Sequence, residues 1–185
     1  MTKKELRDLL EREFYSSPPP SNWFQRLYNY IFNRLFSPSA NACLYIRKMQ
    51  YHATQGGKNH SLLARFYHMK LVNNYGMCVA PTVKIGIGLQ LPHPTGIVLG
   101  SATVIGENCS IYQNVTIGGA NIGDAKAKRQ PHIGDNCIFF SGAMALGNIE
   151  IEDYCVLGAN SVLLSDAISK GIYVGSPAKI IKRMQ

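Results

Sequence analysis

The sequence has no uninterrupted apolar run that could cross a membrane as a helix. Such a span needs about 18 to 20 consecutive apolar residues, and polar or charged residues interrupt every apolar stretch of this 185-residue chain. The first residues, MTKKELRDLLEREF, alternate charges with leucines and so lack the apolar stretch and cleavage site of a secretory signal. We therefore expect a soluble, cytoplasmic protein.

Acidic residues are missing from a long part of the chain. None occurs between Glu13 and Glu107, and residues 1–76 hold eleven Lys or Arg against four acids, while residues 77–185 hold eight against seven. Aromatic residues accompany the cations of the first part, a combination found in proteins that bind nucleic acid or an anionic membrane surface. We expect no nucleic acid, and we keep peripheral contact with the inner face of a membrane as an alternative for this basic, aromatic region.

Paired cysteines are also missing. The five cysteines are an odd number, lie far apart and include no CxxC pair, which argues against a disulfide framework and a zinc or redox motif. We expect free thiols and no metal. The cysteines are Cys43, Cys78, Cys109, Cys137 and Cys155.

Residues 1–76 have the periodicity of helices. Thr2 and Glu5 have the spacing of a capping box, and leucines follow at helical intervals. The segment SSPPPS then interrupts the pattern. The sequence predicts an α-helical N-terminal region over residues 1–76, with helices that end near residue 14, begin near residue 22, and cover about 39–52 and 61–75.

A period of six residues replaces the helical pattern after residue 77. Large apolar residues recur at this interval, and nearly all residues four positions further on are small or β-branched. Repeats of six residues are typical of a parallel β-helix, in which each hexad forms one side of a coil and turns its aliphatic residue inward. The inward series are Leu99, Ile105, Ile111 and Ile117, and then Ile133, Phe139, Ala145, Ile151, Leu157 and Leu163.

Two interruptions break this repeat. Leu91 and Leu99 are eight residues apart rather than six, and the two additional residues fall beside His93. Ile117 and Ile133 are sixteen apart, which predicts a protruding, basic loop over residues 118–132. Because the function of a repeat protein tends to lie where its repeat is interrupted, both places are candidate site segments.

Four stretches in this order resemble a known family: PHPTGIVLG, IYQNVTIGG with the loop after it, IGDNCIFFSGAMALGNIEIEDYCVLGANSVL, and VGSPAKII. Over about residues 76–183 the chain is similar to the hexapeptide acyltransferases, and within them to the serine acetyltransferase family and its relatives that modify cell-surface polysaccharides. The resemblance implies a mainly β fold, a left-handed parallel β-helix domain over 77–185, assembled as a homotrimer with active sites between subunits. It also implies acetyl-CoA as the acetyl donor.

The histidine that matches the family's general base is His93. A hydroxyl is a poor nucleophile at neutral pH, and a neutral imidazole has a pKa suited to accept its proton. The resemblance assigns further residues to the site. Those matching coenzyme A contacts are Gly119, Ser141, Gly142, Ala159 and Lys179, and those expected at the acceptor are Gln113, Arg129, Gln130 and His132.

Three positions depart from the pattern of the serine enzymes. Pro92 stands where those enzymes carry an aspartate directly before the histidine, Cys78 stands at the position of a second aspartate, and the loop histidine is replaced by Gln130. Carboxylates suit the ammonium group of an amino acid, so their loss favours the neutral hydroxyl of a sugar. We therefore expect an O-acetyltransferase acting on a sugar of a capsule, O-antigen or exopolysaccharide, or on its precursor.

Two alternatives stay open from the sequence. One is serine O-acetylation for cysteine biosynthesis, with Arg129 or His132 taking over the missing functions. The other is a non-catalytic, membrane-associated scaffold. A carbonic anhydrase on the same coil would need three metal-binding histidines, whereas the predicted coil holds only His93 and His132.

Overall fold

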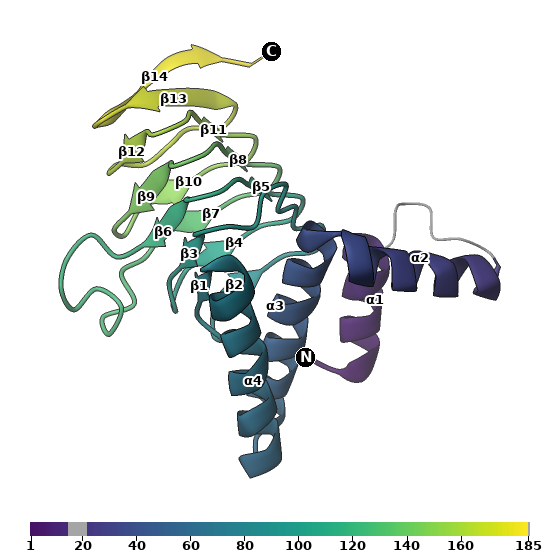
Figure 1. The fold of residues 1–185 in the computed structure, drawn as a ribbon. Helices are drawn as coiled ribbons and strands as arrows, with labels where there is room; N and C mark the ends of the chain where they lie inside the picture. Colours follow the sequence, from purple (N-terminus) through teal and green to yellow (C-terminus); the bar gives the residue numbers. More distant parts are fainter. Residues whose placement is uncertain (15–21, 185) are drawn as a thin grey trace.

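The structure, a computed structural model, describes residues 1–14 and 22–184 and consists of a helical region followed by a long coil of short strands (Figure 1). The helices are α1 (Lys3–Phe14), α2 (Trp23–Phe36), α3 (Pro38–Gln55) and α4 (Lys58–Tyr75). The predicted break at SSPPPS lies outside the described residues. None of the helices in the described ranges is long and apolar enough to cross a membrane.

Local capping interactions explain where the helices begin and end. Thr2 and Glu5 form the predicted capping box, because each backbone N–H donates to the other side chain, at 2.9 and 3.2 Å. Ser37 ends α2 and begins α3, where its Oγ accepts from the Ala40 N–H at 3.2 Å. Helices α3 and α4 are longer than the sequence predicted, since only Gly56 and Gly57, both with positive φ, separate them.

The coil has three parallel sheets, one on each side. Sheet A has the order β1-β3-β6-β9-β12, sheet B has the order β2-β4-β7-β10, and sheet C has the order β5-β8-β11-β13-β14, in which only the β13–β14 pair is antiparallel. The strands are β1 (Cys78–Val79), β2 (Lys84–Ile85), β3 (Val98–Leu99), β4 (Val104–Ile105), β5 (Ser110–Ile111), β6 (Thr116–Gly118), β7 (His132–Ile133), β8 (Ile138–Phe139), β9 (Met144–Leu146), β10 (Glu150–Ile151), β11 (Val156–Leu157), β12 (Val162–Leu163), β13 (Gly171–Gly175) and β14 (Ala178–Arg183).

The six-residue period of the sequence places equivalent residues of successive turns side by side. Ile105, Ile133 and Ile151 are paired in successive turns of sheet B and are all buried. Ile117 lies in the same way between Leu99 and Ala145 in sheet A. The parallel sheets with N-terminal helices confirm the mainly β architecture, while the left-handed sense of the coil remains a prediction. Buried cysteines occupy some of the small inward positions, and no disulfide joins the cysteines of the described part.

A buried ion pair joins the helices to the first turn of the coil. Arg47 on α3 donates from Nε to Glu13 at 2.9 Å and from Nη1 to the Ile85 carbonyl at 2.8 Å. Glu13 Oε1 accepts from the backbone N–H groups of Gly88 and Leu89, both at 3.1 Å. Because both charged side chains are almost completely buried, this network fixes α1, α3 and the start of the coil relative to one another.

Candidate active site

His93 lies on an edge of the coil where the chain passes from sheet C to sheet A. Gln90 bridges to Ser110, and Val98 pairs with Thr116, so seven residues of this turn lie opposite five in the next turn. The two additional residues are those predicted from the spacing. They place His93 on the exposed surface, while Pro94 next to it is buried.

Hydrogen bonds fix this widened turn. The Thr95 N–H donates to the His93 carbonyl at 2.8 Å, and the Thr95 carbonyl accepts from the Asn114 N–H at 2.8 Å. The Gly96 N–H donates to the Tyr75 carbonyl at 2.9 Å, which ties the turn to the end of α4. The backbone that carries His93 is therefore held by the turns of chain on either side of it.

An aromatic row lies along the same edge. The ring of Tyr112 is 6.0 Å from the ring of His93 at an interplanar angle of 60°, and the ring of Phe140 follows 5.2 Å from Tyr112. Such edge-on and tilted contacts are favourable for aromatic rings. The row lies beside the imidazole of His93, which stays exposed.

Three of the predicted coenzyme A residues lie on this edge as well. The Gly142 N–H donates to the Gln113 carbonyl, and the Asn160 N–H donates to the Ser141 carbonyl, both at 2.9 Å, so residues 113, 141 and 159 follow one another in successive turns. Gly142 also has a structural reason to be glycine, since its φ is +69° and an added Cβ would lie 2.2 Å from Asn160 Oδ1. Because their side chains are small, these residues project little from the edge beside the aromatic row.

The other two predicted cofactor residues lie apart from this edge. Gly119 begins the loop after β6, and Lys179 lies exposed on β14 in the hairpin at the C-terminal end. The structure therefore places Ser141, Gly142 and Ala159 with His93, and Gly119 and Lys179 elsewhere.

The loop between β6 and β7 extends away from the coil (Figure 1). Asp124 organises it, because its Oδ2 accepts from the N–H groups of Asn121 at 2.7 Å and Ala120 at 3.0 Å. Its Oδ1 lies 3.0 Å from Arg129 Nε. These backbone hydrogen bonds, that from Asn121 first, and the Arg129 charge hold the pKa of Asp124 below its usual range. Sequence reasoning missed Asp124, although an acid at position 124 and a base at 129 of a basic loop give a signal for it.

Gln130, predicted at the acceptor, is turned into the coil in the structure. Its side chain is only 3% exposed, and its Oε1 accepts from the Ala102 N–H at 2.8 Å. Gln130 thus closes the end of the loop onto the coil and is not available to an acceptor on the surface. Arg129 is exposed but paired with Asp124, and His132 is exposed on β7 of sheet B.

Three of the four predicted acceptor residues, those at positions 129, 130 and 132, are not brought together with His93 in one chain. His93 lies where sheet C meets sheet A, whereas the loop that carries Arg129 connects sheet A to sheet B. Gln113 does lie on the His93 edge, but its Oε1 is buried and has no hydrogen-bond partner among the described residues. A buried acceptor is costly to leave unpaired. The edge therefore lacks a hydrogen-bond donor at Gln113.

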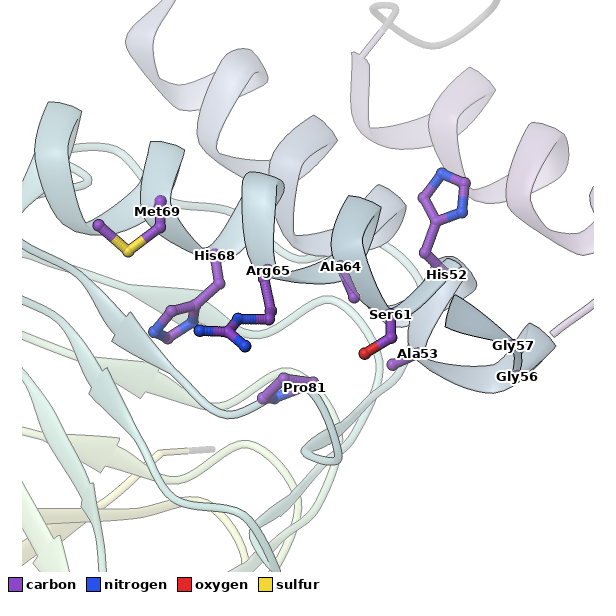
Figure 2. Close-up of a pocket in the computed structure, with 10 residues that line it drawn as sticks. All are labelled: His52, Ala53, Gly56, Gly57, Ser61, Ala64, Arg65, His68, Met69 and Pro81. Carbon is purple, nitrogen blue, oxygen red and sulfur yellow. The ribbon is translucent and has the colours of Figure 1, made fainter. Parts of the chain in front are cut away.

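A pocket of about 500 Å³ lies away from this edge, between α3, α4 and Pro81. Figure 2 shows Arg65 and His68 of α4 side by side near Pro81, while the ring of His52 points away from them. His52 Nδ1 lies 2.8 Å from His60 Nδ1, and the ring of His52 stacks on Tyr67. Sequence reasoning did not single out this histidine pair.

Similarity to known proteins agrees with the six-residue repeat. The profile of the family described as "Bacterial transferase hexapeptide (six repeats)" matches residues 130–165. The serine acetyltransferase of Staphylococcus epidermidis is 42% identical over 123 residues, which are 66% of this chain and 54% of that protein. The enzyme of Staphylococcus aureus is 44% identical over 108 residues, 58% of this chain and 50% of that protein. The chain thus spans about half the length of the curated relatives it matches.

Solved structures extend the similarity to the helices. A crystal structure of Neisseria gonorrhoeae serine acetyltransferase superposes with a TM-score of 0.79 at 29% identity, covering 98% of this chain and 68% of that chain. The same enzyme in complex with serine gives 0.78 at 28% identity, with 97% and 70% covered. A serine acetyltransferase in complex with CoA gives 0.74 at 27% identity, with 97% and 71% covered.

The fold and the repeat define a protein of the hexapeptide-repeat class. Within that class, the chain is similar in sequence and in structure to serine acetyltransferases. These similarities do not support the polysaccharide branch expected from the sequence, because the relatives named above are serine acetyltransferases.

Proposed function

We propose that the chain is an acetyl-CoA-dependent O-acetyltransferase with serine as its acceptor and His93 as its general base. The observation that carries the proposal is the widened turn at His93, which exposes one imidazole beside a row of small residues. Serine acetyltransferases, one solved with serine and one with CoA, share the fold.

The chemistry follows from an exposed imidazole. His93 accepts the proton of the acceptor hydroxyl while that oxygen attacks the thioester carbonyl carbon. The tetrahedral intermediate then collapses, the carbon–sulfur bond breaks, and His93 returns the proton to the leaving sulfur. No acyl-enzyme is needed, and such a base contributes about 10²–10⁴ in rate.

The donor fits the edge by size. Ser141, Gly142 and Ala159 present small side chains in successive turns next to Phe140, so a thin, extended arm could lie along them and bring its thioester toward His93. Backbone N–H groups of the coil are the candidates to stabilise the oxyanion.

We propose further that the complete site forms between subunits of a trimer. Hexapeptide-repeat transferases are typically trimeric, and within one chain the His93 edge and the protruding loop lie on different edges of the coil. In a trimer the loop of one subunit, with Arg129 and the exposed His132 near it, can approach the His93 edge of its neighbour.

A second acceptor class is favoured by particular residues. Pro92 and Cys78 offer no carboxylate to an ammonium group, and Gln130 is turned into the coil. A sugar hydroxyl needs no such charge, so a cell-surface glycan or its precursor is the second candidate.

The test is release of CoA from acetyl-CoA by the purified full chain, with serine, with sugars and glycan precursors, and without acceptor. His93→Gln is the control, because it keeps the polarity of the side chain and removes the base. We expect turnover with serine that falls about 10²–10⁴-fold in His93→Gln. If serine gave no release of CoA and a glycan gave turnover that depends on His93, the acceptor would be the glycan. Binding of acetyl-CoA without turnover on any acceptor would point to the scaffold.

A further inference from the structure

Helix α2 is amphipathic and presents its apolar side to the surroundings. None of its described side chains is buried, and its apolar residues are exposed to unusual extents, for example Phe24 at 64% and Leu35 at 68%. Residues 24, 28, 31 and 35 share one side of a helix, since they are spaced by three, four or seven positions. We call Phe24, Tyr28, Ile31 and Leu35 the outer face of α2.

The polar side of α2 is the side that contacts the protein. Asn29 and Asn33 are the only described residues of the helix that are partly buried. The Asn33 carbonyl accepts from Asn41 Nδ2 of α3 at 3.3 Å, and Arg34 Nη1 donates to the Tyr45 hydroxyl at 2.8 Å. Arg26 lies 3.9 Å from Glu11 of α1. An ordinary surface helix buries its apolar side and exposes its polar side, so α2 is fixed in the reverse orientation.

This orientation leaves an extended apolar surface on α2 that no described residue buries. Figure 1 shows α2 running away from the coil, with its C-terminal end near the start of α3. Aromatic rings continue the surface, because Tyr28, Phe32 and Phe36 contact one another along the helix. Contiguous exposed apolar surfaces of this kind mark binding to a protein or a membrane.

Charge decides between these two occupants. The sequence has no acidic residue from 14 to 106, and α2 itself carries the exposed cations Arg26 and Arg34, with Glu11 of α1 3.9 Å from Arg26. Helix α2 carries two arginines and no acid, so two copies joined through α2 would bring like charges together, which is unfavourable. An anionic surface is attracted instead, by about 1 kcal/mol for each Lys or Arg near a membrane that contains anionic lipids.

The composition and length of α2 fit a lipid surface. Trp and Tyr favour the boundary between lipid and water because one end of each side chain is apolar and the other polar. The helix has 14 residues, about 21 Å in length, which is shorter than the hydrocarbon core of about 30 Å; an amphipathic helix of this kind lies in the plane of the interface. We propose that the outer face of α2 docks the protein on an anionic membrane surface. The proposal is independent of the chemistry at His93.

The test uses the purified full chain and vesicles of phosphatidylcholine with or without phosphatidylglycerol. Trp23 is the single tryptophan of the chain and is 73% exposed on α2, so its fluorescence reports this helix alone. We expect sedimentation with anionic vesicles, a shift of Trp23 emission to shorter wavelength, and loss of both at high salt.

A matched pair of triple variants locates the contact. Phe24→Ser, Ile31→Ser and Leu35→Ser remove the outer face and should weaken partition by about tenfold or more. Leu62→Ser, Leu164→Ser and Ile168→Ser remove exposed apolar residues elsewhere and should leave binding unchanged. Circular dichroism verifies that both variants keep their helices and strands.

Three outcomes would overturn the proposal. The first is failure of the natural chain to bind anionic vesicles while Trp23 emission stays unshifted. The second is equal binding to pure phosphatidylcholine, which would remove the anionic requirement. The third combines two results: neither the natural chain nor the α2 variant binds vesicles, and the α2 variant sediments with a lower mass than the natural chain. That result would show that a second copy covers the outer face.

Discussion

The coil and the helical region use apolar residues in opposite ways. In the coil each inward residue is covered by its equivalents in the turns above and below, as Ile117 is by Leu99 and Ala145. In α2 the apolar residues Ile31 and Leu35 are exposed, and the polar Asn33 faces the protein. A repeat supplies its own partner for every side chain, whereas a single helix depends on whatever packs against it. The pattern of a repeat therefore predicts burial, and the pattern of a helix predicts only that its two sides differ.

The largest expected effect is at the junction of the two regions. Arg47→Ala removes the guanidinium that pairs with Glu13 and leaves a buried carboxylate uncompensated. We expect the free energy of unfolding to fall by about 3–5 kcal/mol, measured by urea denaturation followed by circular dichroism. Arg7→Ala, at an exposed position, is the control and should change it by less than about 0.5 kcal/mol.

A double variant separates charge from packing at this junction. Arg47→Met with Glu13→Gln removes both charges and keeps most of the volume, so it should be more stable than Arg47→Ala alone. If Arg47→Ala cost no more than the exposed control, the ion pair would not join the helices to the coil as described.

The second prediction compares the same substitution in both regions. Ile117→Ala empties a fully buried position of the coil and should cost about 2–5 kcal/mol. Ile31→Ala on α2, where the side chain is 49% exposed, should change the free energy of unfolding by no more than about 0.5 kcal/mol without lipid. Equal losses at both positions would mean that the outer face of α2 is already covered in solution.

The same contrast explains what the sequence could predict. The spacing of eight around His93 was sufficient to place that residue in a widened, exposed turn, because the register of a coil turns each missing or additional residue into a defined change of position. The helix boundaries followed from caps such as Thr2 and Ser37. These features depend on neighbours in sequence or on a fixed period.

Features that depend on distant partners could not be predicted. Gln130 turns inward because the Ala102 N–H is available to it, and nothing in the local sequence shows that amide. Glu13 and Arg47 are 34 residues apart and share no period. The direction of α2 likewise follows from contacts with Asn41 and Tyr45 of α3.

The dependence of stability on pH should also differ between the two regions. As the pH falls, the helical region should lose stability before the coil does. Burial, the neighbouring His60 and then Lys48 lower the pKa of His52 from 6.5. Because the folded state disfavours protonation, the contribution of His52 to stability is present above pH 6.5 and is lost as the pH falls through its lowered pKa. Titration of the histidine resonances by NMR should place His52 below 6.5, and His60→Gln should raise it. A pKa of His52 at or above 6.5 in the natural chain would contradict the effect of burial and of the contact with His60.

The smallest effect is expected in the protruding loop of the coil, and only at strong acidity. The hydrogen bonds from Asn121 and Ala120, with the charge of Arg129, lower the pKa of Asp124 from 3.8. The loop is therefore held throughout the range above 3.8 and is released as the pH falls through the lowered value. Asp124→Asn should imitate that release at neutral pH, since it removes the charge that Arg129 contacts. Hydrogen exchange of the Asn121 amide should become several-fold faster in this variant, while Ile133 in the adjacent strand stays protected. Unchanged exchange at Asn121 would show that the loop is held by its closure onto the coil through Gln130 rather than by Asp124.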